Sequence, residues 1–469
     1  MQPKTTISPI AFCAVILCTA LFLFFCHSLA TSWELNIWGN TASFGAVALF
    51  CLCMIRAVPS LENYFGCKRT VIDFEDNLAV YGACGLWIAF NVVLILAMGA
   101  RRGDGDFLSI TGISNVSYGM YRLAHWIDQP HYINIATYGY RPHVYEVEML
   151  IVFFPLYPIL LRIGQIIFRD YIFTGMIINA FLTFGAAVVC HKLAGVLYGH
   201  NKTSLRALKY VLIFPAGFFL YIPMTEALFL FLSLTCFYFM VKDKFYLAAV
   251  VAFFAALTRL QGILLAVPLC IEAYRYIRER AYAEENEQNF LVTNYYRRLL
   301  KGLLDIPLAM IFAIGPMAGF AVYLGINWFY YGDPLQFLYY QQSHWSQELD
   351  WFFNTASAMA YSMTWRDRRF IISLSLPNLI TMFYVLIVLA IGAKWLRISL
   401  LAYAMVYFAI SYGAAWLLSG PRYALMLFPA AFALAVLTRK KWVDYVTTGI
   451  FLAAYGIYFG LWIGGYYIF

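Results

Sequence analysis

The strongest constraint on this 469-residue chain is the recurrence of apolar runs of about 20 residues along its length. Hydrophobic residues make up 63% of the chain and charged residues only 12%, which is more apolar surface than one water-soluble core can bury. A helix of about 20 residues crosses a bilayer, because each residue adds about 1.5 Å. The sequence therefore predicts an all-α, polytopic membrane protein.

The apolar runs predict about 11 to 13 transmembrane segments. The expected spans lie near residues 8–30, 42–56, 78–100, 171–195, 208–223, 226–241, 304–329, 373–393, 398–418, 423–438 and 443–464, with a broken pair at 245–258 and 261–274. The run at 42–56 is short for a span. If it does not cross, the first helix must run from outside to inside.

Basic residues orient these spans, because cytoplasmic loops collect lysine and arginine. With a cytoplasmic N-terminus, every lysine lies on the inner side or at a cytoplasmic helix end. The net charge of +8 thus reflects topology, and we expect no nucleic-acid partner. We divide the chain into an N-terminal hairpin with its loop, 1–77, and a main transmembrane domain, 78–469. The main domain has two long external loops, 101–170 and 332–372.

The first external loop carries an unusually polar segment, "LAHWIDQPHYINIATYGYRP", at 123–142. The apolar stretch that follows, 146–168, contains two prolines and Arg162, so we expect an interfacial helix that does not cross the membrane. A carboxylate held beside lipid head groups and aromatic side chains suits chemistry on a lipid-borne substrate.

Motifs for other chemistries are missing. No Walker loop, GxGxxG after a strand or HExxH occurs, and no cysteine lies in a predicted external loop. The DxD pattern in "RRGDGD" at 101–106 predicts a glycine turn, with a metal-diphosphate site as the alternative. Glu146 and Glu148 are read as solvated loop acids. We expect no resident metal and no cofactor.

Asp128, His131, Tyr132, Ile135, Ala136, Gly139 and Tyr140 form a D-x-x-H-Y-x-x-I-A-x-x-G-Y run, followed by "FFPLYP" at 153–158. Four further pieces follow in order: "MTEALF" at 224–229, "TRLQG" at 258–262, "GDPLQFLYYQQSHW" at 332–345 and "SGPRYALMLFP" at 419–429. Together they resemble the mannosyltransferases of the phosphatidylinositol-glycan class V type, which include GPI mannosyltransferase 2 and bacterial relatives. Two features depart from that family: Ile127 separates Trp126 from the aspartate, and the two N-terminal spans are additional.

The resemblance implies a GT-C glycosyltransferase fold with its active site on the external or lumenal face. It implies a polyprenyl-phosphate sugar as donor, a glycolipid or cell-envelope glycan as acceptor, and inversion at the anomeric carbon in one displacement. The protein would then be a multi-pass component of the bacterial plasma membrane or the eukaryotic endoplasmic reticulum.

Asp128 is the expected general base, because a carboxylate within hydrogen-bond reach of the attacking hydroxyl can accept its proton. The alternative is an N-cap for the helix that begins near Pro130. Arg422 and Arg259 are the expected phosphate ligands, since a guanidinium stays charged in a partly dry site. Snorkelling or pairing with Glu226 competes with that role.

The remaining candidates are expected to contact substrate. The alternative is packing or interface anchoring, and for Glu226 it is a helix-start carboxylate stabilised by the helix dipole. These candidates are His131, Tyr132, Glu226, Gln341, His344, Trp345 and Tyr423. Two other classes of function stay open: a flippase for a lipid-linked saccharide and a structural subunit of a glycosyltransferase complex. A flippase needs polar groups along a route through the bilayer, whereas these residues gather on one predicted face.

Overall fold

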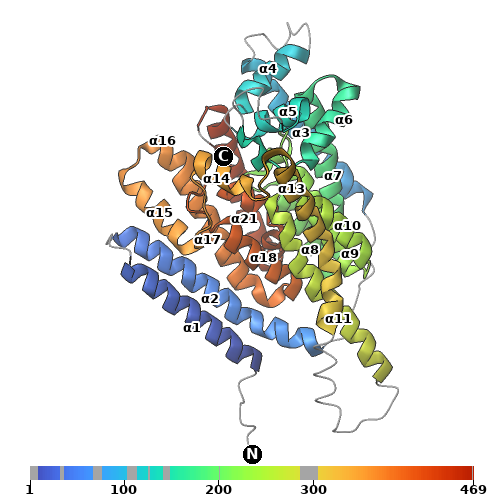
Figure 1. The fold of residues 1–469 in the computed structure, drawn as a ribbon, viewed down its shortest axis with the longest axis vertical. Coiled ribbons are helices and arrows are strands. Elements are labelled where there is room, and N and C mark those ends of the chain that lie inside the picture. Colours follow the sequence, from blue (N-terminus) through green and yellow to red (C-terminus); the bar gives the residue numbers. More distant parts are fainter. Residues whose placement is uncertain are drawn as a thin grey trace, which may run out of the picture.

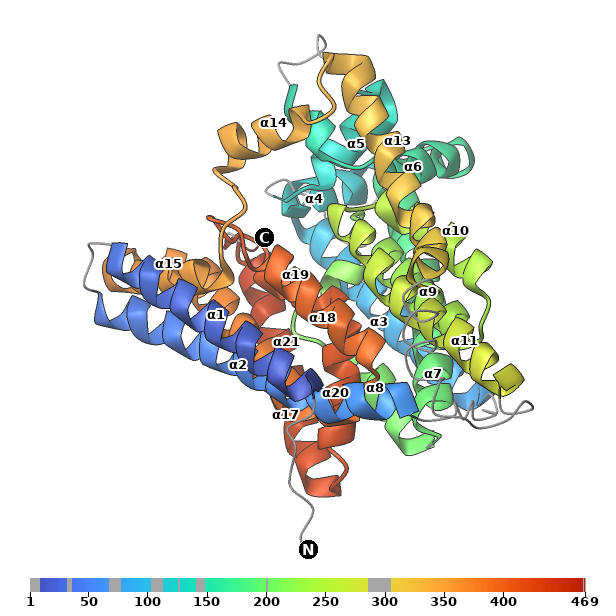
Figure 2. The same cartoon turned by 60° about the horizontal axis from the view of Figure 1, so that its bottom comes forward.

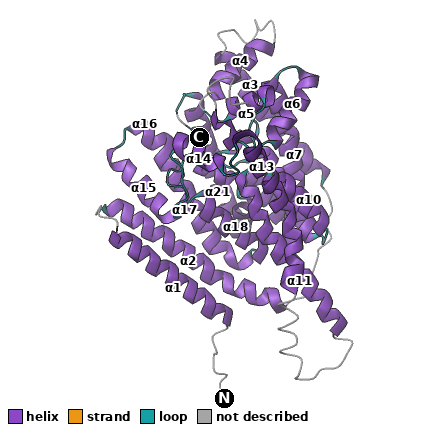
Figure 3. Ribbon diagram, in the orientation of Figure 1, coloured by secondary structure: helices purple, strands orange, loops and turns teal. Residues whose placement is uncertain are grey.

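The computed structural model describes residues 9–31, 36–66, 77–102, 113–124, 127–140, 148–199, 201–285, 305–466 and 468. Helix dominates this part of the chain, as Figure 3 shows, and no β-strand occurs in it. A single isolated bridge pairs Leu349 with Ala414. The prediction of an all-α architecture is confirmed.

The helices follow one another with short breaks. The α-helices are α1 (Pro9–Thr31), α2 (Ile37–Gly66), α3 (Leu78–Arg102), α4 (Ile113–Ala124), α5 (Gln129–Tyr138), α6 (Leu156–Phe168), α7 (Tyr171–Tyr198), α8 (Asn201–Leu212), α9 (Glu226–Val241), α10 (Phe245–Ala256), α11 (Ala266–Glu285), α13 (Ile314–Tyr331), α14 (Gln336–Trp345), α15 (Phe352–Trp365), α16 (Arg368–Phe370), α17 (Leu376–Gly392), α18 (Ile398–Ser411), α19 (Gly420–Met426), α20 (Phe428–Leu437) and α21 (Lys441–Ile463). Short 3-10 or π turns are η1 (Glu148–Val152), η2 (Gly217–Leu220), η3 (Leu260–Leu265), η4 (Ile311–Ala313), η5 (Ile371–Ser375) and η6 (Ala393–Trp395).

Seven helices of the described residues are long and apolar enough to cross a membrane. An eighth candidate is the pair α19 and α20, which is bent by 71°. These helices make the chain an integral, multi-pass membrane protein. Five further apolar helical segments are only 10–17 residues long, one of them the part of α1 at Cys13–Ser28, so the total number of crossings stays a prediction.

Four predicted spans differ from the structure. One is the run at 423–438, which the break between α19 and α20 divides. The run at 42–56 belongs to a candidate span of 25 residues, Ile37–Leu61. The prediction that this run is short for a span is therefore wrong. The run at 208–223 is not one helix, because α8 ends at Leu212 and an irregular segment with Pro215 and Pro223 follows. The run at 398–418 likewise stops at Ser411.

The bundle has a packed interior and a peripheral pair of helices. Helix α7 packs on α9, and α10 packs on both α9 and α13. The α1–α2 pair lies along one side of the bundle, beside α15 and α17, in both Figure 1 and Figure 2. The division of the chain at residue 77 remains a prediction.

Helix α6 has the character expected of the 146–168 stretch. Its 13 residues bury Tyr157 and Leu161, while Ile163 and Ile166 are 58% and 75% exposed. At about 1.5 Å per residue the helix is too short to cross a bilayer alone. An interfacial position for α6 stays a prediction that this amphipathic face supports.

Candidate functional site

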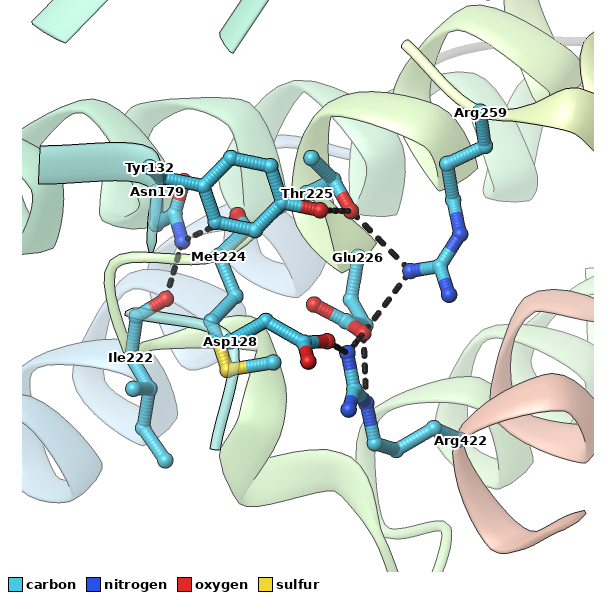
Figure 4. Close-up of polar contacts among 9 residues, drawn as sticks. All are labelled: Asp128, Tyr132, Asn179, Ile222, Met224, Thr225, Glu226, Arg259 and Arg422. Carbon is cyan, nitrogen blue, oxygen red and sulfur yellow. Dashed lines mark hydrogen bonds and ion pairs between the residues drawn. The ribbon is translucent and has the colours of Figure 1, made fainter. Parts of the chain in front are cut away.

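Four charged side chains meet where the chain breaks between helices. Asp128 stands directly before α5, and Glu226 is the first residue of α9. Arg259 lies between α10 and η3, and Arg422 lies in the first turn of α19. These four residues, shown in Figure 4, are called the charge quartet below.

The quartet is a continuous chain of ion pairs. Arg422 donates from Nε to Glu226 Oε1 at 2.7 Å and from Nη2 to Asp128 Oδ2 at 2.7 Å. Arg259 donates from Nη1 to the same Glu226 oxygen at 2.8 Å and to Thr225 Oγ1 at 3.0 Å. Two carboxylates thus balance two guanidinium groups, which lowers the cost of placing these charges in a largely buried site.

Asp128 does not cap its helix. Helix α5 starts as expected, with Pro130 in its first turn, yet the Asp128 carboxylate makes no capping hydrogen bond. Its side chain is 28% exposed and turns to Arg422. Partial burial opposes ionisation, but Arg422 outweighs it and holds the pKa of Asp128 below its ordinary value, so this carboxylate is ionised at neutral pH.

Glu226 lies beneath the site instead of in it. Its side chain is 0% exposed and is enclosed by the two arginines. One carboxylate oxygen receives all the contacts, while Oε2 has no hydrogen-bond partner within the part of the chain that the structure describes. The expected contact of Glu226 with substrate is therefore replaced by contacts with Arg259 and Arg422.

Side chains on one face of α7 bind the irregular segment that precedes Glu226. The Asn179 side-chain amide donates to the carbonyl oxygens of Ile222 and, at 3.0 Å, Met224. One turn along α7, Thr183 donates to the Leu220 carbonyl at 3.1 Å. These bonds satisfy backbone oxygens that no helix uses, so the turn before α9 has a defined position in a buried setting. Figure 4 shows Asn179 beside this turn.

Arg259 reaches the quartet because a glycine lets the chain fold back on α10. A Cβ atom at Gly262 would lie 2.3 Å from the Ala255 carbonyl carbon and oxygen, so glycine is required there. The arginine side chain is 12% exposed. This tight return explains why Arg259 follows a helix end instead of continuing it.

Three members of the quartet, Asp128, Arg259 and Arg422, form one wall of a cavity of about 230 Å³. Eight of the ten predicted site residues line this cavity: Asp128, His131, Tyr132, Arg259, Gln341, Trp345, Arg422 and Tyr423. The sequence pieces at 128–140, 258–262, 332–345 and 419–429, far apart in the chain, therefore converge on one place.

An aromatic wall faces this cavity. The His131 ring stacks on Phe153 with centroids 4.7 Å apart, and the Trp345 ring meets Phe153 edge-on at 5.8 Å. Burial lowers the pKa of His131, although the nearby Asp128 carboxylate opposes that effect. The imidazole is thus neutral at pH 7 and offers an uncharged ring.

Side-chain amides complete the cavity. Gln341 donates to Gln347 at 3.0 Å, and Gln347 donates to the Trp416 carbonyl at 3.1 Å. Gln347 and Gln261 also line the cavity but were not predicted as site residues. The available signal was that Gln261 lies within "TRLQG" and that Gln347 follows "YYQQSHW" by two residues. His344 is exposed and does not line the cavity; its ring lies 5.8 Å from Tyr340.

The described residues contain no group of three His, Cys, Asp or Glu side chains able to hold a metal ion. Residues 103–106 of the DxD pattern, for which a glycine turn was predicted, lie outside the described part of the chain, as do Glu146 and the side chain of Glu148. The nine cysteines within the described ranges are free thiols.

Among solved structures, the chain is similar to ArnT from Cupriavidus metallidurans, crystallised with bound undecaprenyl phosphate. The similarity covers 65% of this chain and 53% of ArnT, at 14% sequence identity and a TM-score of 0.39. The chain thus matches about half the length of ArnT. No protein-family model and no curated protein matches the chain.

Proposed function

We propose that this protein is an integral-membrane glycosyltransferase that moves a hexose from a polyprenyl-phosphate carrier to a lipid-linked or cell-envelope glycan. The observation that carries this proposal is the partly exposed Asp128 carboxylate in a cavity, 2.7 Å from a buried arginine. The resemblance to class V mannosyltransferases supports a GT-C fold and mannose as the transferred sugar.

Asp128 is the general base of the proposed reaction. The acceptor hydroxyl oxygen attacks the anomeric carbon of the donor, and its proton passes to the Asp128 carboxylate. The bond between the anomeric carbon and the phosphate oxygen breaks, and polyprenyl phosphate leaves with the bonding electrons. A single displacement of this kind inverts the anomeric configuration.

The two arginines stabilise the departing phosphate. In the described structure Arg422 uses Nε and Nη2 for Glu226 and Asp128, so its Nη1 group remains to donate to a phosphate oxygen. Arg259 also lines the cavity and is bound to the quartet through Nη1. Fixed guanidinium groups stabilise developing negative charge without reorganising, which is how an electrostatic site lowers a barrier.

Glu226 is a positioning residue in this account. It binds both arginines from below and keeps their planes in place, at no cost to the space where substrate binds. A buried carboxylate also prevents two neighbouring guanidinium groups from repelling each other.

The aromatic and amide walls suit a sugar. Trp345 and the His131–Phe153 stack offer apolar surfaces for the C–H face of a pyranose ring. Gln341 and Gln347 offer donors and acceptors for hydroxyl groups. A cavity with charge on one wall and neutral polar groups on another matches a phosphosugar.

The test is transfer by purified protein in nanodiscs with a short-chain polyprenyl-phosphate mannose and a glycolipid acceptor. We expect transfer by the wild type, none from a nucleotide sugar, and none by Asp128→Asn. Donor movement across the bilayer without transfer would indicate the flippase alternative. Transfer unchanged in Asp128→Asn would reject Asp128 as the base.

A further inference from the structure

Three exposed arginines, Arg366, Arg368 and Arg369, form a basic surface around α16 in the sequence "TWRDRRF". We call them the arginine patch. They lie in the second predicted external loop, where the distribution of lysines predicts few basic residues. An excess of positive charge at that place attracts a partner of opposite charge.

The carboxylate within the patch sequence, Asp367, does not neutralise the three arginines. The Asp367 carboxylate accepts a hydrogen bond from the Phe370 backbone N–H at 2.7 Å and caps α16. This carboxylate is therefore bound to the backbone. The patch therefore keeps a surplus of positive charge, three arginines against one carboxylate.

Two candidate spanning helices end at the patch. One runs from Arg368 to Trp395. The other, α21, ends at Ile463, and Arg369 donates to the carbonyl of Gly465 just beyond it, at 2.5 Å. Helix ends of this kind lie near lipid head groups, so the arginines are at the level of lipid phosphates.

Aromatic side chains mark the same level. The Arg366 guanidinium lies 4.0 Å from the centroid of the Trp365 ring and 4.7 Å from that of Phe370. Trp365 and Tyr361 are 56% and 40% exposed, as expected of interfacial aromatic residues. The rings hold the guanidinium plane by cation–π contact and keep it available for a forked contact with phosphate oxygens.

We propose that the arginine patch binds the phosphate group of an anionic phospholipid from the surrounding leaflet. The bound lipid would lie beside the candidate site. The Phe370 ring is 5.9 Å from that of Trp416, whose carbonyl accepts from the cavity residue Gln347. In Figure 1, α14, α16 and the C-terminal end all lie in the upper half of the molecule. This proposal does not depend on the proposed transfer reaction.

Trp365 provides a built-in reporter for the test. Vesicles of phosphatidylcholine with brominated phosphatidylglycerol should quench a component of the fluorescence that Trp365→Phe removes. Brominated phosphatidylcholine should quench that component only at about tenfold higher mole fraction, because its head group carries no net negative charge for the arginines to attract.

The test variant is Arg366→Ala with Arg368→Ala, which spares Arg369 and its backbone contact. We expect it to lose the preference for phosphatidylglycerol. The matched control, Lys440→Ala with Lys441→Ala, removes two charges at the other end of the 23-residue α21, about 35 Å away, and should keep the preference. A preference that survives in the patch variant, or is missing in the wild type, overturns the proposal. Displacement of the lipid by inorganic phosphate would show a soluble anion to be the ligand instead.

Discussion

Two buried glutamates in this protein are each surrounded by arginines, yet their surroundings differ. Glu272 on α11 binds Arg397 through both carboxylate oxygens, at 2.5 and 2.6 Å, and also accepts from Ser399 at 2.5 Å. Glu226 uses one oxygen for Arg259 and Arg422. The first cluster continues along α11 through Arg275 to Glu279, whereas the second continues to Asp128, which is 28% exposed at a cavity.

The difference teaches how to separate structural from functional ion pairs. The first cluster joins helices, here α11 and the start of α18, and its glutamate uses both carboxylate oxygens for Arg397. The second cluster keeps a charged group at the wall of a cavity, where a ligand can contact it, although this arrangement stabilises the fold less. Substitutions in the two clusters, and in the contacts that position them, should therefore have different effects.

The largest expected effects fall on different properties in the two clusters: the transfer rate in one and the stability in the other. Asp128→Asn should lower the transfer rate by at least about 10²–10⁴-fold, to below detection, because the general base is lost. Glu272→Gln should leave the rate per folded molecule unchanged and destabilise the protein by about 3–5 kcal/mol, because Arg397 loses its buried partner. Transfer assays normalised to folded protein, together with thermal unfolding, measure both. Equal losses of activity in the two variants would remove the distinction.

The next effect is on pH dependence. The lowered pKa of Asp128 means that the base stays ionised until the pH falls below about 3.9, the ordinary value of an aspartate. The rate of the wild type should therefore be lost only below that pH. Arg422→Gln removes the cation that lowers this pKa, so the acidic limb of kcat/KM should move to higher pH.

Arg422→Lys is the control for that shift, because it keeps the charge but cannot bridge Asp128 and Glu226 in the same geometry. It should lose about 10²–10³-fold in rate while its acidic limb stays near that of the wild type. An acidic limb in Arg422→Gln that coincides with the wild-type limb would contradict the coupling of these two residues.

The smallest expected effect concerns the face of α7 that holds the turn before Glu226. Asn179→Leu removes the hydrogen bonds to Ile222 and Met224 and should lower kcat about tenfold with KM nearly unchanged, because Glu226 and its arginines shift. Thr183→Val removes the neighbouring bond to Leu220 and should cost about 1 kcal/mol of stability without changing kcat. The two kcat values, measured side by side, check the prediction. Matching losses in both variants would reduce Asn179 to a packing role.

Much of the fold was accessible from the sequence because apolar runs report burial in lipid directly. The runs at 226–241 and 443–464 correspond closely to α9 and α21. The breaks at 213–225 and 412–419 were missed, since their apolar residues read as continuous spans while their backbone is held by side chains such as Asn179 and Asn378. Apolar periodicity contains no information about such partners.

The site was only partly predictable for a similar reason. Asp128 and Arg422 stood out because charge is rare in this chain, and the structure joins them. The neutral Gln347 did not stand out, because one more amide in a loop has no signature until folding places it against Trp416. Glu226 was identified, but its burial beneath the arginines depends on α7, which lies far from it in the sequence.

The most direct test of the central claim is equilibrium binding of polyprenyl phosphate to the wild type, Asp128→Asn and Arg422→Gln. Asp128→Asn should bind this product at least as tightly as the wild type, because a negative charge is removed from the cavity. The same variant should transfer no sugar. Arg422→Gln should lose the binding. Weaker binding by Asp128→Asn, or full binding by Arg422→Gln, would contradict a cavity that pairs a base with a phosphate-binding arginine.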